Sequence, residues 1–183
     1  MHSSIYFPSE DSYLLQDSLK QYLKDKPKSI NILEIGSGSG ILAKTCIDGG
    51  FKNILATDIN LESVKHLKKQ GVNSINSDLF KKIKDKFDLI IFNPPYLPED
   101  SREPEYSKIQ TTAGKKGYEI ILKFLKQAKN NLSKNGAILL LFSSLSKPNI
   151  IKRELKKQGF KHSLINSASL PFFEELYVYK IVL

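Results

Sequence analysis

The residues most able to do chemistry are an Asn-Pro-Pro-Tyr sequence at positions 93–96, directly after the apolar run 87–92. Asn93 offers a side-chain carbonyl, and Pro94 offers a main-chain carbonyl on a ring that holds φ at about −65°. Two such acceptors can hold both N–H bonds of a planar amide or aminopurine and stabilise positive charge developing on its nitrogen. The ring of Tyr96 can pack against the same planar amide or aminopurine. We predict Asn93, Pro94 and Tyr96 as catalytic residues, and Asn93, Pro94, Pro95 and Tyr96 as substrate-binding residues; the alternative is a rigid turn leaving a strand.

A glycine turn, Gly36-Ser37-Gly38-Ser39-Gly40, follows an earlier apolar run at 30–35. Glycines at alternate positions let the chain turn tightly and let a ligand lie against bare backbone at Gly36 and Gly38. Position 41 is isoleucine, so the dinucleotide pattern Gly-x-Gly-x-x-Gly is not matched, and the Gly-Lys-Ser/Thr of a phosphate loop is absent. Glu34 would repel phosphates and suits a cationic ligand, such as the amino group of a methionine moiety.

Two more carboxylates stand where strands are expected to end. Asp58 can accept hydrogen bonds from ribose hydroxyls. Asp78 can accept from an adenine amino group, while the main-chain N–H of Leu79 can reach a ring nitrogen. Each acid alone could instead cap a helix or a turn. Together with the glycine turn they predict S-adenosylmethionine as cofactor, and with Asn93 they predict methyl transfer to an amide or amine nitrogen.

Apolar runs alternate with amphipathic stretches, which predicts βαβ units and a parallel sheet. The expected helices cover residues 10–23, 41–48, 61–70, 117–132 and 148–158, and the expected strands cover 30–35, 53–57, 72–76, 87–92, 137–143, 160–167 and 175–183. We predict an α/β fold, with a doubly wound, mostly parallel seven-stranded sheet of Rossmann-like type and an antiparallel last strand. A single domain over 1–183 is expected, with a helical lead-in at 1–29. The Ser-Lys-Asn-Gly sequence at 133–136 is expected to form a turn.

The segment 94–114 has no predicted helix or strand and directly follows the candidate catalytic residues. Connections of this length in compact domains are usually functional or disordered. We interpret it as a substrate-binding loop rather than a passive linker.

The formal charge of +9 is compatible with attraction to nucleic acid. The lysines are spread along the chain, however, as in a lysine-rich composition with solvated side chains. Cys46 is the only cysteine, which excludes an internal disulfide and a cysteine-cluster zinc site, and no metal site is expected from the scattered histidines. No apolar run reaches the roughly 20 residues that cross a bilayer, and no signal-peptide pattern begins the chain, so a cytoplasmic location is expected.

Four segments, spread over nearly the whole chain, resemble class I S-adenosylmethionine-dependent methyltransferases, and more narrowly the HemK/PrmC-like protein glutamine methyltransferases. They are YFPSEDSYLL at 6–15, LEIGSGSG at 33–40, NPPY at 93–96 and ELYVYKI at 175–181. The first and last resemble the short archaeal and eukaryotic branch, which methylates the glutamine of the Gly-Gly-Gln motif in class 1 translation release factors. The resemblance implies cofactor contacts from Ser12, Glu34, Gly36, Asp58, Asp78, Leu79 and Asn93, and target-amide contacts from Asn93, Pro94 and Tyr96.

The resemblance also implies two partners. A release factor is the expected substrate, and a small zinc-binding activator protein is expected to pair with the sheet edge at Val72–Asn76. Two other functions stay open. The chain could be an adenine N6-methyltransferase acting on RNA or DNA, since Asn-Pro-Pro-Tyr serves aminopurines equally well, or a non-enzymatic cofactor-binding scaffold. The acidic residues of the 99–105 stretch disfavour nucleic acid, which needs a basic groove and a stacking surface.

Overall fold

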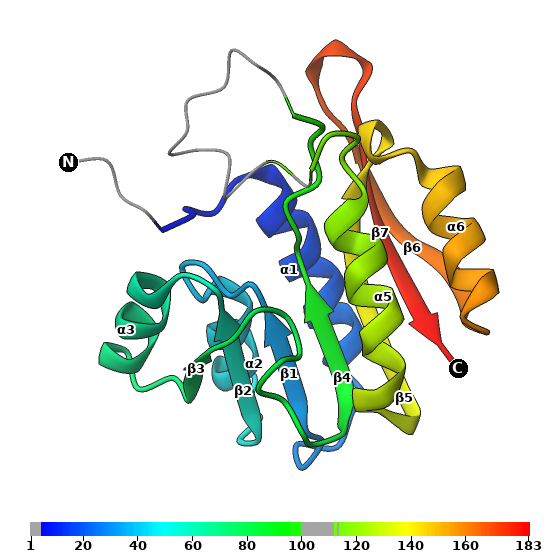
Figure 1. The fold of residues 1–183 in the computed structure, drawn as a ribbon. Coiled ribbons are helices and arrows are strands. Elements are labelled where there is room, and N and C mark those ends of the chain that lie inside the picture. The colour runs from blue at the N-terminus through cyan, green and yellow to red at the C-terminus, as the bar shows by residue number, and fades with distance from the viewer. Residues whose placement is uncertain (1–4, 100–111, 113) are drawn as a thin grey trace.

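Seven strands form one sheet in the computed structural model, which describes residues 5–99, 112 and 114–183 (Figure 1). The strand order is β3-β2-β1-β4-β5-β7-β6. Neighbouring strands from β3 to β5 pair in parallel, whereas β7 runs antiparallel to both β5 and β6. The strands are β1 (Ile32–Ile35), β2 (Ile54–Asp58), β3 (Ser74–Asn76), β4 (Phe87–Phe92), β5 (Leu132–Ser143), β6 (Lys161–Ser169) and β7 (Glu175–Val182). The predicted α/β fold with an antiparallel last strand is confirmed.

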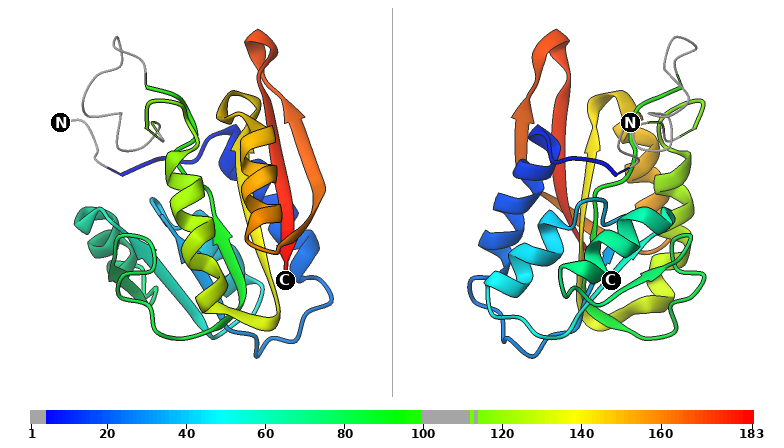
Figure 2. Two further views of the ribbon diagram at one scale, coloured as in Figure 1. Left: turned by 45° about the vertical axis from the view of Figure 1, so that its right-hand side comes forward. Right: turned by 90° about the vertical axis from the view of Figure 1, so that its left-hand side faces the viewer.

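Within the described residues, five α-helices cover the two faces of this sheet (Figure 2). They are α1 (Glu10–Leu23), α2 (Ile41–Asp48), α3 (Leu61–Lys69), α5 (Glu119–Asn131) and α6 (Pro148–Lys157). Buried side chains of α1, α2 and α3 share one apolar cluster, and those of α5 and α6 share another. Successive residues of β4 alternate between the clusters, as expected for a strand buried on both faces. The apolar character of each helix on one side therefore fixes which face of the sheet it covers.

The segment 133–136 differs from the prediction, because it continues β5 instead of forming a turn. Leu132 pairs with Phe87 and Ala137 pairs with Leu89, so a five-residue step on β5 opposes a two-residue step on β4. A Cβ atom on Gly136 would lie 2.9 Å from the Phe87 carbonyl oxygen. This glycine therefore permits a close approach of two backbones at a bulge, a role that its sequence context does not distinguish from a turn.

Strand β3 forms one edge of the sheet, as predicted, but it is shorter than the expected 72–76. Val72 lies before the strand, and its N–H donates to the carbonyl of Leu67 at the end of α3. The helix therefore holds the chain until Ser74, where pairing with β2 begins.

The position of the functional site follows from the strand order. From β1 the chain winds outward through β2 and β3, and then crosses back to place β4 on the other side of β1. Ligands of open α/β sheets bind at such a reversal, beyond the carboxyl ends of the strands. Ile35 pairs with Phe92 on one side and with Thr57 on the other, so the residues that follow β1, β2 and β4 emerge together.

Candidate active site

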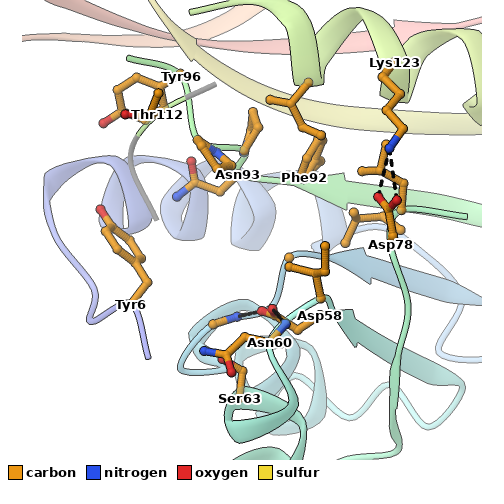
Figure 3. A pocket seen from close by; sticks show the side chains of 18 of the residues that line it. Tyr6, Asp58, Asn60, Ser63, Asp78, Phe92, Asn93, Tyr96, Thr112 and Lys123 are labelled. Atoms are coloured by element: carbon orange, nitrogen blue, oxygen red, sulfur yellow. Dashed lines mark hydrogen bonds and ion pairs between the residues drawn. The ribbon is translucent and has the colours of Figure 1, made fainter. Parts of the chain in front are cut away.

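A pocket of about 510 Å³ opens at this end of the sheet. Its volume lies in the range of roughly 300–1,000 Å³ that is usual for small-molecule sites. It is lined by the loops after β1, β2, β3 and β4, by the lead-in to α1, and by the start of α5. Figure 3 shows Tyr6, Asn93 and Tyr96 toward one end, Asp58, Asn60 and Ser63 along another wall, and Asp78 beside Lys123.

The glycine turn contributes bare backbone to this pocket at Gly36 and Gly38. Gly38 has a φ of 50°, in the left-handed region, and its N–H donates to Oδ2 of Asp58 at 2.8 Å. Gly40 has a different task and is not a lining residue. A Cβ atom there would lie 2.2 Å from the Leu67 side chain, so this glycine lets α2 begin against α3.

Asp58 ends β2 and lies in the pocket wall, where sequence reasoning placed it. Its carboxylate already accepts two main-chain N–H bonds, from Gly38 at 2.8 Å and from Asn60 at 2.7 Å. Burial raises the pKa of this carboxyl above its ordinary value despite these bonds. A carboxylate has about four acceptor positions, so capacity remains for hydroxyl groups of a ligand.

Glu34 and Ser12 are two predicted cofactor residues that the structure does not bring into the pocket wall. Glu34 is only 2% exposed, and its carboxyl accepts from the N–H of Ala43 in the first turn of α2 at 2.9 Å. Burial raises its pKa to about 8, which favours the protonated form of this carboxyl over its ordinary behaviour. Ser12 is buried against Asp11, to which both its N–H and its hydroxyl donate.

Asp78 and Leu79 do lie in the wall, with a partner that the sequence did not indicate. Lys123 of α5 donates to both carboxylate oxygens of Asp78, at 3.0 and 3.1 Å, and Lys81 lies 2.8 Å from one of them. These two lysines hold the pKa of Asp78 below its usual range. An adenine amino group at this carboxylate would have to share it with the lysines. Leu79 has a φ of 48°, which turns the chain sharply at the pocket wall.

Asn93 presents its side-chain oxygen without a hydrogen-bond partner. Its Nδ2 donates to Oδ2 of Asp11 at 3.0 Å, whereas Oδ1 is buried and has no donor among the described residues. A carboxylate can only accept, so the amide nitrogen must face Asp11 and the amide oxygen must face away from it. A buried acceptor without a partner is rare in proteins. We read it as a position for an N–H of a ligand.

The rest of the Asn-Pro-Pro-Tyr turn also lines the pocket. The Tyr96 carbonyl accepts from the Ser146 hydroxyl at 2.8 Å, which ties this turn to the segment after β5. The Tyr6 hydroxyl donates to Asp11 at 2.9 Å. Burial, and next the charge of Asp11, raise the pKa of both phenols well above the ordinary value, so both are neutral at physiological pH.

The predicted substrate loop 94–114 falls partly outside the described residues, namely at 100–111 and 113. Its two ends meet at the pocket, where Leu97 and Thr112 form a parallel bridge. The N–H of Glu99 donates to the carbonyl of Gly114 at 3.1 Å. Both ends of the loop are thus anchored beside the candidate catalytic turn.

Comparison with known proteins supports what this geometry indicates. A family model described as "Methyltransferase small domain" matches residues 12–162. A putative protein N5-glutamine methyltransferase of Methanocaldococcus jannaschii is 39% identical over 97% of this chain and 91% of its own length. The chain belongs to the methyltransferase small domain family. The resemblance inferred from the sequence is confirmed.

More distant methyltransferases extend the match. The human protein named Methyltransferase HEMK2 is 28% identical over 87% of this chain and 81% of its own length. The structure of the Mtq2–Trm112 complex of E. cuniculi, responsible for methylating the termination factor eRF1, includes a chain with a TM-score of 0.77 and 23% identity. The alignment covers 98% of this chain and 99% of that one, and it shows a common fold.

The methyl donor of this methyltransferase is S-adenosylmethionine, and the pocket fits it. The described lining includes four carboxyl groups, Asp11, Asp58, Asp78 and Glu119, but one basic group, Lys123. An acidic pocket accommodates a cationic sulfonium and disfavours phosphate groups. Apolar walls from Ile59, Leu79 and Phe92 suit the flat base of a nucleoside.

No helix in the described part of the chain is both long enough and apolar enough to cross a membrane.

Proposed function

We propose that this methyltransferase transfers a methyl group from S-adenosylmethionine to the side-chain amide nitrogen of the glutamine in the Gly-Gly-Gln motif of a class 1 release factor. The observation that carries the proposal is the buried Oδ1 of Asn93, which has no donor among the described residues and belongs to an amide held in place by Asp11. It is an acceptor for one N–H of a planar –NH₂ group. The names of the relatives from Methanocaldococcus jannaschii and E. cuniculi support glutamine, and a termination factor, as the target.

Cofactor contacts are proposed from the residues of the wall. Asp58 would receive the ribose hydroxyls, Asp78 and the Leu79 N–H would meet the adenine edge, and Gly36 and Gly38 would let the amino-acid moiety pass close to the backbone. When bound, S-adenosylmethionine supplies an electrophilic methyl carbon on a positively charged sulfur. Asp11 lies in the pocket wall, whereas Glu34 does not.

The chain's contribution to the reaction is position and charge. Asn93 Oδ1 and the Pro94 carbonyl would accept the two N–H bonds of the target amide and direct its nitrogen at the methyl carbon. An N–C bond would form as the S–C bond breaks, and the nitrogen would then lose a proton to water. Both acceptors stabilise the charge on that nitrogen before the proton leaves, and alignment supplies much of the rate. Tyr6 and Tyr96 stay protonated and act as walls and hydrogen-bonding groups, not as bases.

Nucleic acid is a weaker candidate for the acceptor. A phosphate backbone needs basic groups near the reacting base. The described pocket wall has four carboxyl groups, and its one lysine is engaged by Asp78. Methylation of RNA, as expected of an adenine N6-methyltransferase, is one outcome that the experiment below can detect.

The experiment supplies labelled methyl donor to the protein with a release factor, with the same release factor carrying Glu in place of the Gly-Gly-Gln glutamine, and with total RNA. Label is expected on the first acceptor alone. An Asn93→Ala variant should lose transfer and keep cofactor affinity within about tenfold, since the contact it removes is to the acceptor. Label on RNA, or equal label on the Glu-substituted factor, would refute the proposal.

We also propose a small zinc-binding activator protein as a partner at the β3 edge. The Asn73 carbonyl and the Ser77 N–H bond to β2, so the alternate residues Ser74 and Asn76 direct their main-chain groups away from it. The E. cuniculi neighbour is a complex with Trm112. Such an activator should slow hydrogen exchange at the Ser74 and Asn76 amides and leave β6, the opposite edge, unchanged. Equal exchange with and without the activator would contradict this site.

A cytoplasmic location is proposed on the same basis, because release factors act on ribosomes there. Cys46, buried as a free thiol, is compatible with a reducing compartment.

A further inference from the structure

The turn between β6 and β7, residues 170–174, carries two phenylalanines with almost no contacts. Phe172 is 99% exposed and Phe173 is 100% exposed. Figure 1 shows this hairpin, coloured orange to red, reaching past the other strands at the end of the sheet where the chain leaves β4. Single exposed apolar residues are ordinary, but adjacent, fully exposed aromatic side chains on a protruding tip are typical of a contact surface.

The backbone at this tip is unusual for the residues it holds. Phe172 and Phe173 have φ values of 61° and 62°, in the left-handed region that bulky side chains seldom adopt. The N–H of Leu170 donates to the Glu174 carbonyl at 2.7 Å and closes the turn. Asparagine or glycine would fit this backbone with less strain. The two aromatic groups are thus held outward against the local preference, which points to a use outside the molecule.

Hydrogen bonds connect the tip to the mouth of the pocket. The N–H of Glu175 donates to the Ser144 hydroxyl at 3.1 Å, and the Ser146 hydroxyl donates to the Tyr96 carbonyl at 2.8 Å. Ser144–Ser146 is a single short helix, so it bridges the hairpin and the turn that bears Asn93. A protein that inserts a side chain beside Asn93 would meet this tip at its surface.

The charge of the hairpin identifies the class of partner. Between Lys161 and Lys180 there is no lysine or arginine, although the whole chain has 28 of them. Glu174 and Glu175 follow the phenylalanines directly, and one carboxylate oxygen of Glu174 is buried without a donor in the described residues. Acidic and apolar groups repel a phosphate backbone and suit an apolar recess bordered by basic side chains.

We propose that residues 170–175 dock the protein that carries the target glutamine, with Phe172 and Phe173 in an apolar recess of that protein and the exposed Glu175 facing basic groups at its rim. This inference rests on the proposed function. In this proposal the pocket recognises the target amide, and the hairpin adds affinity for the folded protein around that amide. A short peptide should bind in the pocket without contacting the hairpin.

The test is a Phe172→Asn/Phe173→Asn double variant, in which asparagine fits the left-handed backbone. Methylation of an intact release factor is compared with that of a short synthetic peptide containing Gly-Gly-Gln. The KM for the release factor should rise by at least about tenfold, as for the loss of an interface anchor, while peptide kinetics stay within about twofold. The matched control, Leu164→Thr/Ile165→Thr, removes two exposed apolar residues from β6 in the same hairpin and should change neither.

An unchanged KM for the release factor, or an equal loss with both substrates, would overturn the docking role. Binding of the release factor, measured by calorimetry without methyl donor, separates the two proposals. If the native protein binds the factor more tightly than the tip variant but does not methylate it, the proposed function fails and the docking role stands. If it methylates the factor and the tip variant does so with the native KM, the docking role fails and the function stands.

Discussion

Nδ2 of Asn93 donates to a carboxylate oxygen of Asp11 at 3.0 Å, although the two residues lie 82 positions apart in the chain. Asp11 is 4% exposed and also accepts from the Tyr6 hydroxyl and the Ser12 N–H. A buried carboxylate with several donors is a strong acceptor in a fixed position. It therefore fixes the orientation of the Asn93 amide, with the nitrogen toward Asp11 and the oxygen directed away from it.

Replacement of Asp11 by asparagine should lower kcat by about 10- to 100-fold, the scale of a lost hydrogen bond to a charged group. An amide at this position can donate as well as accept, so it no longer holds the Asn93 oxygen toward the substrate. Steady-state kinetics with the release factor measure the effect. Asp17→Asn, at an exposed position of the same helix, is the control and should leave kcat unchanged. A normal kcat in Asp11→Asn would show that Asn93 needs no such support.

Removal of the Asp58 carboxylate should weaken cofactor binding by roughly 1–3 kcal/mol. Asp58→Ala loses the proposed acceptor for the ribose and also leaves the N–H groups of Gly38 and Asn60 without their partner. Calorimetric titration with S-adenosylmethionine gives the difference directly. Asp48→Ala, at the exposed end of α2, serves as the reference. Equal affinities in the two variants would remove Asp58 from the cofactor site.

Glu34 should make the protein less stable as the pH rises from about 4.5 toward 8. Burial raises its pKa in the folded state to about 8 from the ordinary 4.5, so over this interval the folded chain keeps a proton that the unfolded chain has released. The contribution of Glu34 to stability is complete below its unfolded pKa of 4.5 and is lost as the pH rises through its folded pKa of about 8. Over that interval the free energy of unfolding should fall by up to about 1.4 kcal/mol per pH unit. Urea unfolding across this range should show the slope in the native protein and a flatter dependence in Glu34→Gln. Parallel curves for the two proteins would place the titrating group elsewhere.

Gly40 should tolerate alanine worse than Gly50 does. The φ angle is 82° at Gly40 and 83° at Gly50, so alanine at either position would be strained by about 1–2 kcal/mol in this left-handed conformation. A Cβ atom at Gly40 would also lie 2.2 Å from the buried Leu67 side chain, whereas at Gly50 no atom of another described residue would lie within 4 Å of it. Overpacking should add about 1–3 kcal/mol to the loss in Gly40→Ala. Denaturant unfolding of the two variants measures the difference, and equal losses would mean that Leu67 moves aside freely.

Local pattern predicted much of the architecture. Helix α1 and strand β4 have the predicted bounds, 10–23 and 87–92, because spacing of apolar residues at period 3.6 and a short uninterrupted apolar run are visible without partners. The edge position of β3 and the antiparallel last strand also match. The segment 133–136 does not match the predicted turn, because a glycine at position 136 is equally compatible with a turn and with a close backbone contact at a bulge.

The candidate site divides in the same way. Asn93, Asp58, Asp78 and Leu79 lie in the pocket wall, where their places at strand ends indicated. Glu34 was expected to face the ligand. Because the side chains of a strand point alternately to its two faces, this one instead lies beneath α2 and accepts a hydrogen bond from the Ala43 N–H. Neither Lys123 beside Asp78 nor Asp11 beside Asn93 was assigned a role. Asp11 nevertheless lies within the 6–15 segment on which the family resemblance rests.

The sequence by itself determined the elements, the family and the chemical types of the site residues, because each depends on neighbours a few positions apart. Only the tertiary structure decided three other features. They are the orientation of the Asn93 amide, the pairing of Asp78 with two lysines, and the exposure of the Phe172 side chain. These depend on residues far apart in the chain that meet when the strands take their register, and on the water that burial removes from around them.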